Sequence, residues 1–192
     1  MEVHAFICTR SKDLKSVTKT LVDYLKSAGV QVSLIVNSSS IFKGYKRAFE
    51  KANPNPDDII ILCHDDIEIL NNKDSFLKVL VTNLLHKPET GFLGVAGTTY
   101  LSEDAVWWNH QLWSKGKHSG FVLHGEDINK LQPTYYGEYR DVVVLDGLFL
   151  AASAKTINAV GLEKPEYFEG EWDFYDIHYT TRAHQMGLIN KV

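Results

Sequence analysis

The sequence predicts a single α/β domain built around a mostly parallel sheet, and three observations lead to this fold class. Short apolar runs alternate with segments of helical periodicity in the first half of the chain. The 192 residues, with 44% hydrophobic content, suit one core and leave little room for two domains. The apolar run at residues 59–63 ends directly in His64-Asp65-Asp66, as expected of a buried strand that delivers polar groups to the carboxyl edge of a sheet.

The first half of the chain predicts the order β-α-β-α-β. Leucine and valine recur at helical spacing after the opening strand, and Gly29 ends that helix. A polar turn follows the second strand, and Asn53-Pro54-Asn55-Pro56 closes the second helix. A right-handed parallel arrangement is expected from this order. The expected elements are strands at residues 3–8, 32–36 and 59–63 and helices at 12–28 and 42–52.

The second half of the chain is less regular. Residues 100–140 place tryptophan and tyrosine among glycine and polar residues, which predicts loops and hairpins over the mouth of the sheet. The glycines of residues 91–97 indicate bends or close backbone approach within a strand. The remaining expected elements are a helix at 74–86, strands at 91–97 and 142–151, and a helix at 175–183.

Charge, hydropathy and cysteine content indicate which classes of binding partner and which cellular compartment to expect. A net charge of -4 and a pI near 6.0 give no electrostatic reason to expect nucleic acid or an anionic membrane surface as partner. No stretch predicts a transmembrane segment, and the first residues lack a signal peptide. Cys8 and Cys63 lie in apolar runs, which argues against a disulfide framework and favours a cytoplasmic location. Residues 187–192 read like the start of a further strand, the pattern of one domain cut from a longer protein.

His64, Asp65 and Asp66 form the leading candidate site. Adjacent carboxylates repel each other unless a cation or a set of hydrogen-bond donors neutralises them. Aspartate oxygens favour Mg2+ or Mn2+, and an added imidazole shifts the preference toward Mn2+. The alternative is a solvated turn after a core strand, where aspartate is common.

Seven landmarks along the chain occur in a recognisable order. They are Cys8-Thr9-Arg10, Asn37-Ser38-Ser39, Gly44-Tyr45, His64-Asp65-Asp66, Gly94-Val95-Ala96-Gly97, Leu145-Asp146-Gly147-Leu148-Phe149-Leu150-Ala151 and Tyr175-Asp176. Together they resemble the family-2-like glycosyltransferases of the GT-A fold, in the branch with a His-x-Asp metal motif. The chain resembles the N-terminal domain of a longer bacterial or large-DNA-virus enzyme of this kind. The resemblance implies a three-layer α/β/α sandwich over residues 1–192, with a nucleotide-binding half at about 1–100 and an acceptor-binding half at about 101–192.

The resemblance also implies which residues bind the nucleotide-sugar. Thr9 and Arg10, with Asn37 and Ser38, would line the nucleotide pocket at the ends of the first two strands, where polar side chains suit the ribose and the base. Asp65 would hold the ribose or a metal-bound water. For Thr9 and Ser38 the alternative is ordinary turn chemistry.

A metal ion on the diphosphate is implied at Asp66. Breaking the sugar–phosphate bond leaves a nucleoside diphosphate with growing negative charge, which a divalent Lewis acid such as Mn2+ or Mg2+ offsets. His64 stands where the commoner motif has its first aspartate, so the resemblance implies a metal role for this residue as well.

Two aspartates are the implied catalytic residues. Asp176 matches the position of the family's general base, which takes the proton of the acceptor hydroxyl. The alternative is a helix N-terminal aspartate that interacts with the helix dipole. Asp146 matches a carboxylate beside the sugar and acceptor, with a structural turn as its alternative role. His178 replaces an aspartate that is usual in the family, so its acceptor contact differs from the family pattern.

Glu171 and Trp172 precede the catalytic helix and are expected to contact the acceptor. An indole there can stack on the apolar face of a sugar. Core or lid packing is the alternative role for this tryptophan and for Trp107, Trp108 and Trp113.

These residues predict a metal-dependent glycosyltransferase that moves a sugar from a nucleotide-diphosphate donor, a UDP-sugar, to an acceptor hydroxyl of a glycan. Inversion is favoured because Asp176 supplies a base and no covalent nucleophile stands out. Three alternatives stay open: a non-catalytic nucleotide-sugar or glycan binding module, a metal-dependent nucleotidyltransferase or phosphohydrolase, and a purely structural partner domain.

Overall fold

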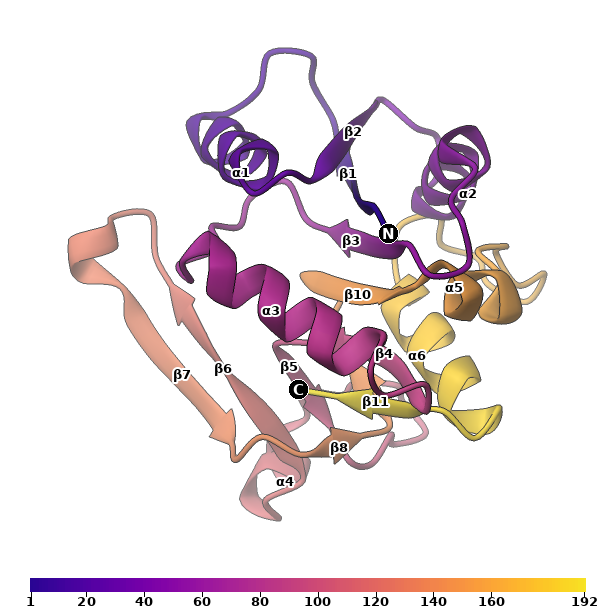
Figure 1. The fold of residues 1–192 in the computed structure, drawn as a ribbon. Helices are drawn as coiled ribbons and strands as arrows, with labels where there is room; N and C mark the ends of the chain where they lie inside the picture. Colours follow the sequence, from indigo (N-terminus) through magenta and orange to yellow (C-terminus); the bar gives the residue numbers. More distant parts are fainter.

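The computed structural model describes residues 1–127 and 129–192 and forms an α/β/α sandwich (Figure 1). Five of the seven strands of the large sheet run in one direction, whereas β10 and β8 run the opposite way. The predicted three-layer fold with a mostly parallel sheet is therefore confirmed. In spatial order the strands are β2 (Gln31–Val36), β1 (Val3–Thr9), β3 (Ile59–Cys63), β10 (Phe149–Ser153), β4 (Thr90–Gly94), β11 (Ile189–Lys191) and β8 (Asp141–Val142).

Helices cover both faces of the large sheet because each carries an apolar stripe that the sheet buries. Leu21 and Leu25 of α1 share one core cluster with Phe76 and Leu80 of α3. The helices α2, α5 and α6 pack with the other core cluster on the opposite face. The helix bounds are α1 (Ser16–Ser27), α2 (Ile41–Ala52), α3 (Lys73–Leu84), α4 (His110–Ser114), α5 (Ala154–Val160) and α6 (Tyr175–Gln185).

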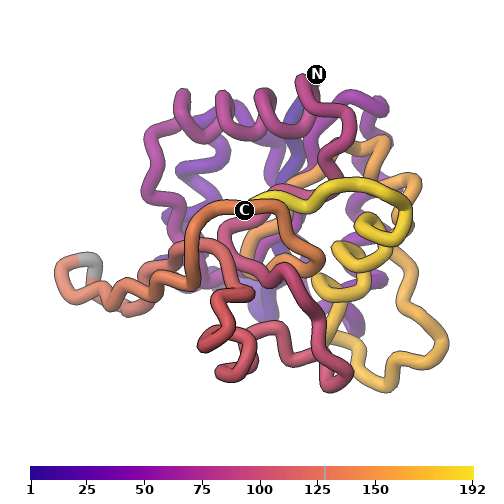
Figure 2. Tube along the Cα trace, turned by 90° about the horizontal axis from the view of Figure 1, so that it is seen from below, coloured from indigo at the N-terminus to yellow at the C-terminus, as the bar shows by residue number. Residues whose placement is uncertain are grey.

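A smaller antiparallel sheet lies beside the large one. Figures 1 and 2 show that its β6–β7 hairpin projects away from the body of the molecule. This hairpin confirms the expectation of hairpins within residues 100–140. In spatial order the strands are β7 (Gln132–Gly137), β6 (His118–His124), β5 (Ala96–Thr98) and β9 (Val144–Leu145).

The prediction of one continuous strand at residues 142–151 was wrong. The structure divides it into β8, β9 and β10, because Asp146 makes a local turn in which its Oδ1 accepts the Leu148 N–H at 2.8 Å. The predicted strand at 91–97 likewise divides into β4 and β5, which belong to different sheets. These interruptions change the direction of the chain and put Asp146 on a connection instead of within a strand.

Two helix predictions also need correction. The first helix begins at Ser16 instead of residue 12, since the Ser11 hydroxyl accepts the Asp13 N–H at 3.0 Å in a local turn that competes with helix. The helix α5 was not predicted. Its start is fixed by the Ser153 hydroxyl, which accepts the Thr156 N–H at 3.1 Å as an N-cap.

Candidate active site

The candidate site lies at the carboxyl edge of the large sheet, defined as the edge where β1, β2 and β3 end. Thr9, Asn37 and His64 come to this edge from three parallel strands. Because β10 is antiparallel to β3, its start lies at the same edge, and the His64 N–H donates to the Leu148 carbonyl at 3.1 Å. Asp146 therefore reaches the same edge from a distant part of the sequence.

The residues predicted to bind the nucleotide gather at the ends of β1 and β2. The Asn37 N–H donates to the Thr9 carbonyl at 3.0 Å, and Asn37 has a left-handed backbone with φ of 52°. Arg10 is exposed, whereas Thr9 is buried. The Ser38 hydroxyl donates to the Ser40 carbonyl at 2.7 Å. The structure thus brings these residues together and gives Ser38 the turn contact that the sequence left as its alternative.

Gly44 of α2 is closely packed against the ends of β1 and β2. A Cβ at Gly44 would lie 3.1 Å from Ile35 and 3.2 Å from both the Cys8 Sγ and the Ser38 Oγ. A side chain at this position would push Ile35, Cys8 or Ser38 aside by a few tenths of an ångström, so glycine favours the close approach of α2 to the ends of β1 and β2. Cys8 and Cys63 are both free thiols.

His64 and Asp66 can converge on one ion. The His64 Nδ1 lies 4.0 Å from the Asp66 Oδ1, and both side chains are accessible, at 44% and 60% exposure. Asp65 is half-buried, and its carbonyl accepts the Thr18 hydroxyl at 2.7 Å, which ties this turn to α1. The two facing side chains fit a divalent ion that takes its remaining ligands from substrate phosphates and water, as Mg2+ sites commonly do. Among the described residues, no group of three close metal-binding side chains includes them.

Tyr175 orients the imidazole of His64. The Tyr175 hydroxyl donates its hydrogen to the Gly147 carbonyl at 2.8 Å, so it accepts one from the His64 Nε2 at 3.0 Å. This assigns the imidazole proton to Nε2 and leaves the lone pair of Nδ1 directed to the side of Asp66. Sequence reasoning gave Tyr175 no role. Its place directly before Asp176, at the first residue of α6, was the available signal.

Asp146 and Asp176 form a partly buried carboxylate pair. Burial is the main cause that raises the pKa of Asp176 to about 6, and the charge of Asp146 raises it further. The N–H groups of Ile177 and Gly147 each donate to Asp176 at 2.8 Å and oppose that rise. Burial also raises the pKa of Asp146, which the Leu148 N–H and the nearby His64 counteract. Such a pair, with one pKa near neutrality, is the arrangement expected of an acid–base site.

The residues predicted to contact the acceptor lie in two places. Glu171 pairs with Lys164 at 2.7 Å, and its carbonyl accepts the Ile41 N–H at 2.9 Å, which places it beside the start of α2. Trp172, next in the chain, is 38% exposed. The His178 ring packs on Phe168, with centroids 5.7 Å apart. His178, which lies on α6, therefore packs against the segment that precedes this helix.

The other tryptophans divide between core and surface. Trp107 is buried and packs in an aromatic cluster with His118 and Tyr136, at centroid separations of 5.9 and 5.6 Å. Trp108 and Trp113 are exposed. Trp113 nevertheless packs on Tyr136, with centroids 5.1 Å apart, and Trp108 packs on Trp107 at 6.0 Å. Packing on aromatic neighbours is thus seen for all three, and Trp107 alone among them is buried.

A surface hollow of about 400 Å³ lies away from the carboxyl edge. It is formed between α2 and α5, where Lys46, Phe49, Ile157 and Glu163 line it. No residue predicted for the site lines this hollow. The carboxylate pair and the residues predicted to bind metal therefore lie at the carboxyl edge and not in this hollow.

Comparison with known proteins supports the fold and identifies the family. No described helix is long and apolar enough to cross a membrane, and no curated protein matches the chain. The crystal structure of A197 from STIV is similar over all of this chain and 81% of that one, with 12% identity and a TM-score of 0.51. The 4-diphosphocytidyl-2C-methyl-D-erythritol synthase of Anaerococcus prevotii is similar over 93% of this chain and 81% of that one, with 11% identity and a TM-score of 0.46. Residues 7–190 match the sequence model of the glycosyltransferase-like family, and the chain belongs to that family.

Proposed function

We propose that this protein transfers a sugar from a nucleotide-diphosphate sugar, a UDP-sugar, to the hydroxyl group of a glycan acceptor, with inversion. Family membership supports sugar transfer. The single observation that carries the proposal is that Asp176, whose pKa is raised to about 6, meets Asp146 and His64 at the carboxyl edge. A general base, a sugar-binding carboxylate and a metal-binding side chain are thus available side by side.

Asp176 acts as the general base in this proposal. Two backbone N–H groups hold its carboxylate, one on each oxygen, so the side chain is fixed in place before the acceptor arrives. A pKa near 6 leaves Asp176 ionised at neutral pH while keeping it more basic than an exposed aspartate. It then accepts the proton of the acceptor hydroxyl as that oxygen attacks the anomeric carbon. Asp146 hydrogen-bonds the sugar hydroxyls beside it.

His64 and Asp66 would hold Mn2+ or Mg2+ beside the diphosphate of the donor. When bound, the ion offsets the charge that develops on the leaving nucleoside diphosphate. Tyr175 keeps the Nδ1 of His64 free to coordinate, because its hydroxyl already engages Nε2. Thr9, Arg10, Asn37, Ser38 and Asp65 are the residues proposed to bind the nucleotide, and Glu171 and Trp172 are those proposed to contact the acceptor. The ring of His178 packs on Phe168.

Product analysis with UDP-sugars tests the proposal. Purified protein is incubated with UDP-glucose, UDP-galactose and UDP-N-acetylglucosamine in Mn2+, and release of UDP is followed with and without glycan acceptors. We expect Asp176→Asn to lower the rate by at least about a hundredfold, the usual contribution of a general base. Asp23→Asn, which changes an exposed aspartate of α1, is the matched control and should keep full activity.

The alternatives give different products. A nucleotidyltransferase releases pyrophosphate from a nucleoside triphosphate, and a binding module binds UDP-sugar without releasing UDP. Either outcome would replace glycosyl transfer as the function of this site. A structural domain binds no nucleotide at all, which calorimetric titration with UDP and GDP detects.

A further inference from the structure

We infer that Glu2, His4 and Asp58 form a zinc site at the amino edge of the large sheet. Each of these three residues offers one ligand atom, and the three atoms all lie within 4.8 Å of one another. Among the described residues, no other group of three or more His, Cys, Asp or Glu side chains comes this close together. The inference rests on this geometry and not on the proposed glycosyl transfer.

The site lies at the other end of the strands from the candidate active site. Val3 of β1 pairs with Ile59 of β3 at this edge, whereas His64 follows the opposite end of β3. Five strand residues span about 17 Å at roughly 3.3 Å each. An ion here is therefore separate from any ion on the nucleotide.

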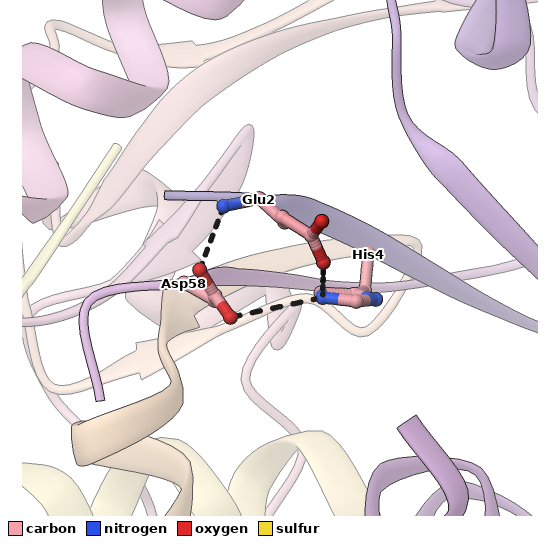
Figure 3. A group of neighbouring side chains, drawn as sticks. All are labelled: Glu2, His4 and Asp58. Carbon is pink, nitrogen blue, oxygen red and sulfur yellow. Dashed lines mark hydrogen bonds and ion pairs between the residues drawn. The ribbon is translucent and has the colours of Figure 1, made fainter. Parts of the chain in front are cut away.

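His4 is buried with an unsatisfied nitrogen. The residue is only 4% exposed, and its Nε2 has no hydrogen-bond partner. A buried polar atom in this state is costly unless it finds a ligand. Figure 3 shows that Nε2 is turned to the two carboxylates, at 3.6 Å from the Glu2 Oε2 and 3.9 Å from the Asp58 Oδ2.

These distances are too long for hydrogen bonds but suit ligands that share one ion. Hydrogen bonds of this type are about 2.7–3.2 Å long. Zinc lies about 2.0–2.1 Å from nitrogen and oxygen ligands, so neighbouring ligand atoms of a tetrahedral site are about 3.4 Å apart. A small closure around Zn2+ would bring Glu2, His4 and Asp58 to that spacing, with water in the fourth position.

Hydrogen bonds already fix the position of the Asp58 carboxylate, as is expected of a metal ligand. The N–H groups of Glu2 and Asn55 donate to its two oxygens at 2.6 and 2.7 Å. Glu2 is the solvent-facing member, with its side chain 59% exposed, and provides the path by which an ion enters.

The donor set favours zinc over harder ions. One imidazole and two carboxylates suit Zn2+ and Mn2+, and Zn2+ binds more tightly to such sites. The Met1 ammonium lies 4.0 Å from the Asp58 Oδ1, so the two carboxylates and this group together carry one net negative charge toward the ion. The ion would connect the start of β1 to the segment before β3 and stabilise the folded chain by binding only to it.

Calorimetric titration with Zn2+ tests the site. Tag-free protein carrying Asp66→Ala is used, so that the carboxyl edge contributes little to the binding heat. We expect one Zn2+ per chain, a higher melting temperature with Zn2+, and reversal of both by a chelator. Glu2→Gln and His4→Gln should each weaken binding at least about tenfold, the low end of the effect of losing a metal-site contact.

Matched controls and a second variant keep the test decisive. Glu126→Gln and His110→Gln change exposed residues of the same types and should leave Zn2+ affinity unchanged. If His4→Gln fails to fold, the exposed Glu2→Gln still gives the answer. No Zn2+ binding by the parent protein, or equal binding by Glu2→Gln, would overturn the inference whatever the transferase assay shows.

Discussion

Replacing Asp176 with asparagine should change how the stability of the protein depends on pH. The pKa of Asp176 rises from 3.8 to about 6 on folding, and each unit corresponds to about 1.36 kcal/mol. Ionising this side chain therefore costs about 3 kcal/mol more in the folded state than in the unfolded chain. Because the folded pKa is raised, the stabilising contribution of protonated Asp176 is complete below about pH 4 and is lost as the pH rises through about 6.

Asparagine does not ionise, so the unfolding free energy of the variant does not fall in this way as the pH rises. Its single side-chain oxygen cannot accept from both Gly147 and Ile177, and one lost hydrogen bond costs about 1 kcal/mol at every pH. The difference in unfolding free energy, wild type minus Asp176→Asn, should thus fall by about 3 kcal/mol between about pH 3 and pH 7. Urea denaturation at several pH values measures it. A difference that does not vary with pH, as expected for the exposed control Asp23→Asn, would refute the reasoning.

Three further variants test the site and the fold. Tyr175→Phe leaves the Gly147 carbonyl without its donor and should lower the unfolding free energy by about 1–3 kcal/mol in urea denaturation. The same variant frees the His64 ring, so Mn2+-dependent UDP binding should weaken in calorimetry while metal-free UDP binding stays the same. Asp66→Ala should weaken UDP binding at least about tenfold, or about 1.4 kcal/mol, only when Mn2+ is present; equal loss without metal would contradict a metal role. Asn190→Ala removes a buried side chain that bonds three backbone groups at 2.8–3.1 Å and should lower the unfolding free energy by about 3 kcal/mol or more.

The sequence predicted the parts of the fold that follow from local periodicity. The strands and helices up to residue 63 occur in the predicted order, because their apolar patterns and the Asn53–Pro56 breaker are local signals. The antiparallel direction of β10 could not be predicted, since it depends on which strand is adjacent in space and not in sequence. The strand was predicted to continue through Asp146 because this aspartate and Gly147 lie inside an apolar run, although a structural turn was the alternative role given to Asp146.

The sequence likewise predicted some parts of the candidate site and missed others. His64 and Asp66 follow a strand that could be recognised, and the structure places their ligand atoms 4.0 Å apart. The proposed zinc site left no sequence signal, because Asp58 is more than fifty positions from Glu2 and His4 and meets them only when β1 pairs with β3. The role of Tyr175 depends on the direction of one hydroxyl hydrogen bond, which no residue pattern encodes.

The position of β10 has a consequence for synthesis of the chain. In the sheet β10 lies between β3 and β4, although its residues follow β4 by more than fifty positions in sequence. Until residues 149–153 emerge, one edge of β3 has no partner, and every residue of that strand is apolar. Unpaired apolar edges are sites of aggregation. A fragment ending near residue 100 would therefore aggregate instead of folding as a separate nucleotide-binding unit, and dissection of the two halves requires that β10 be supplied with the first.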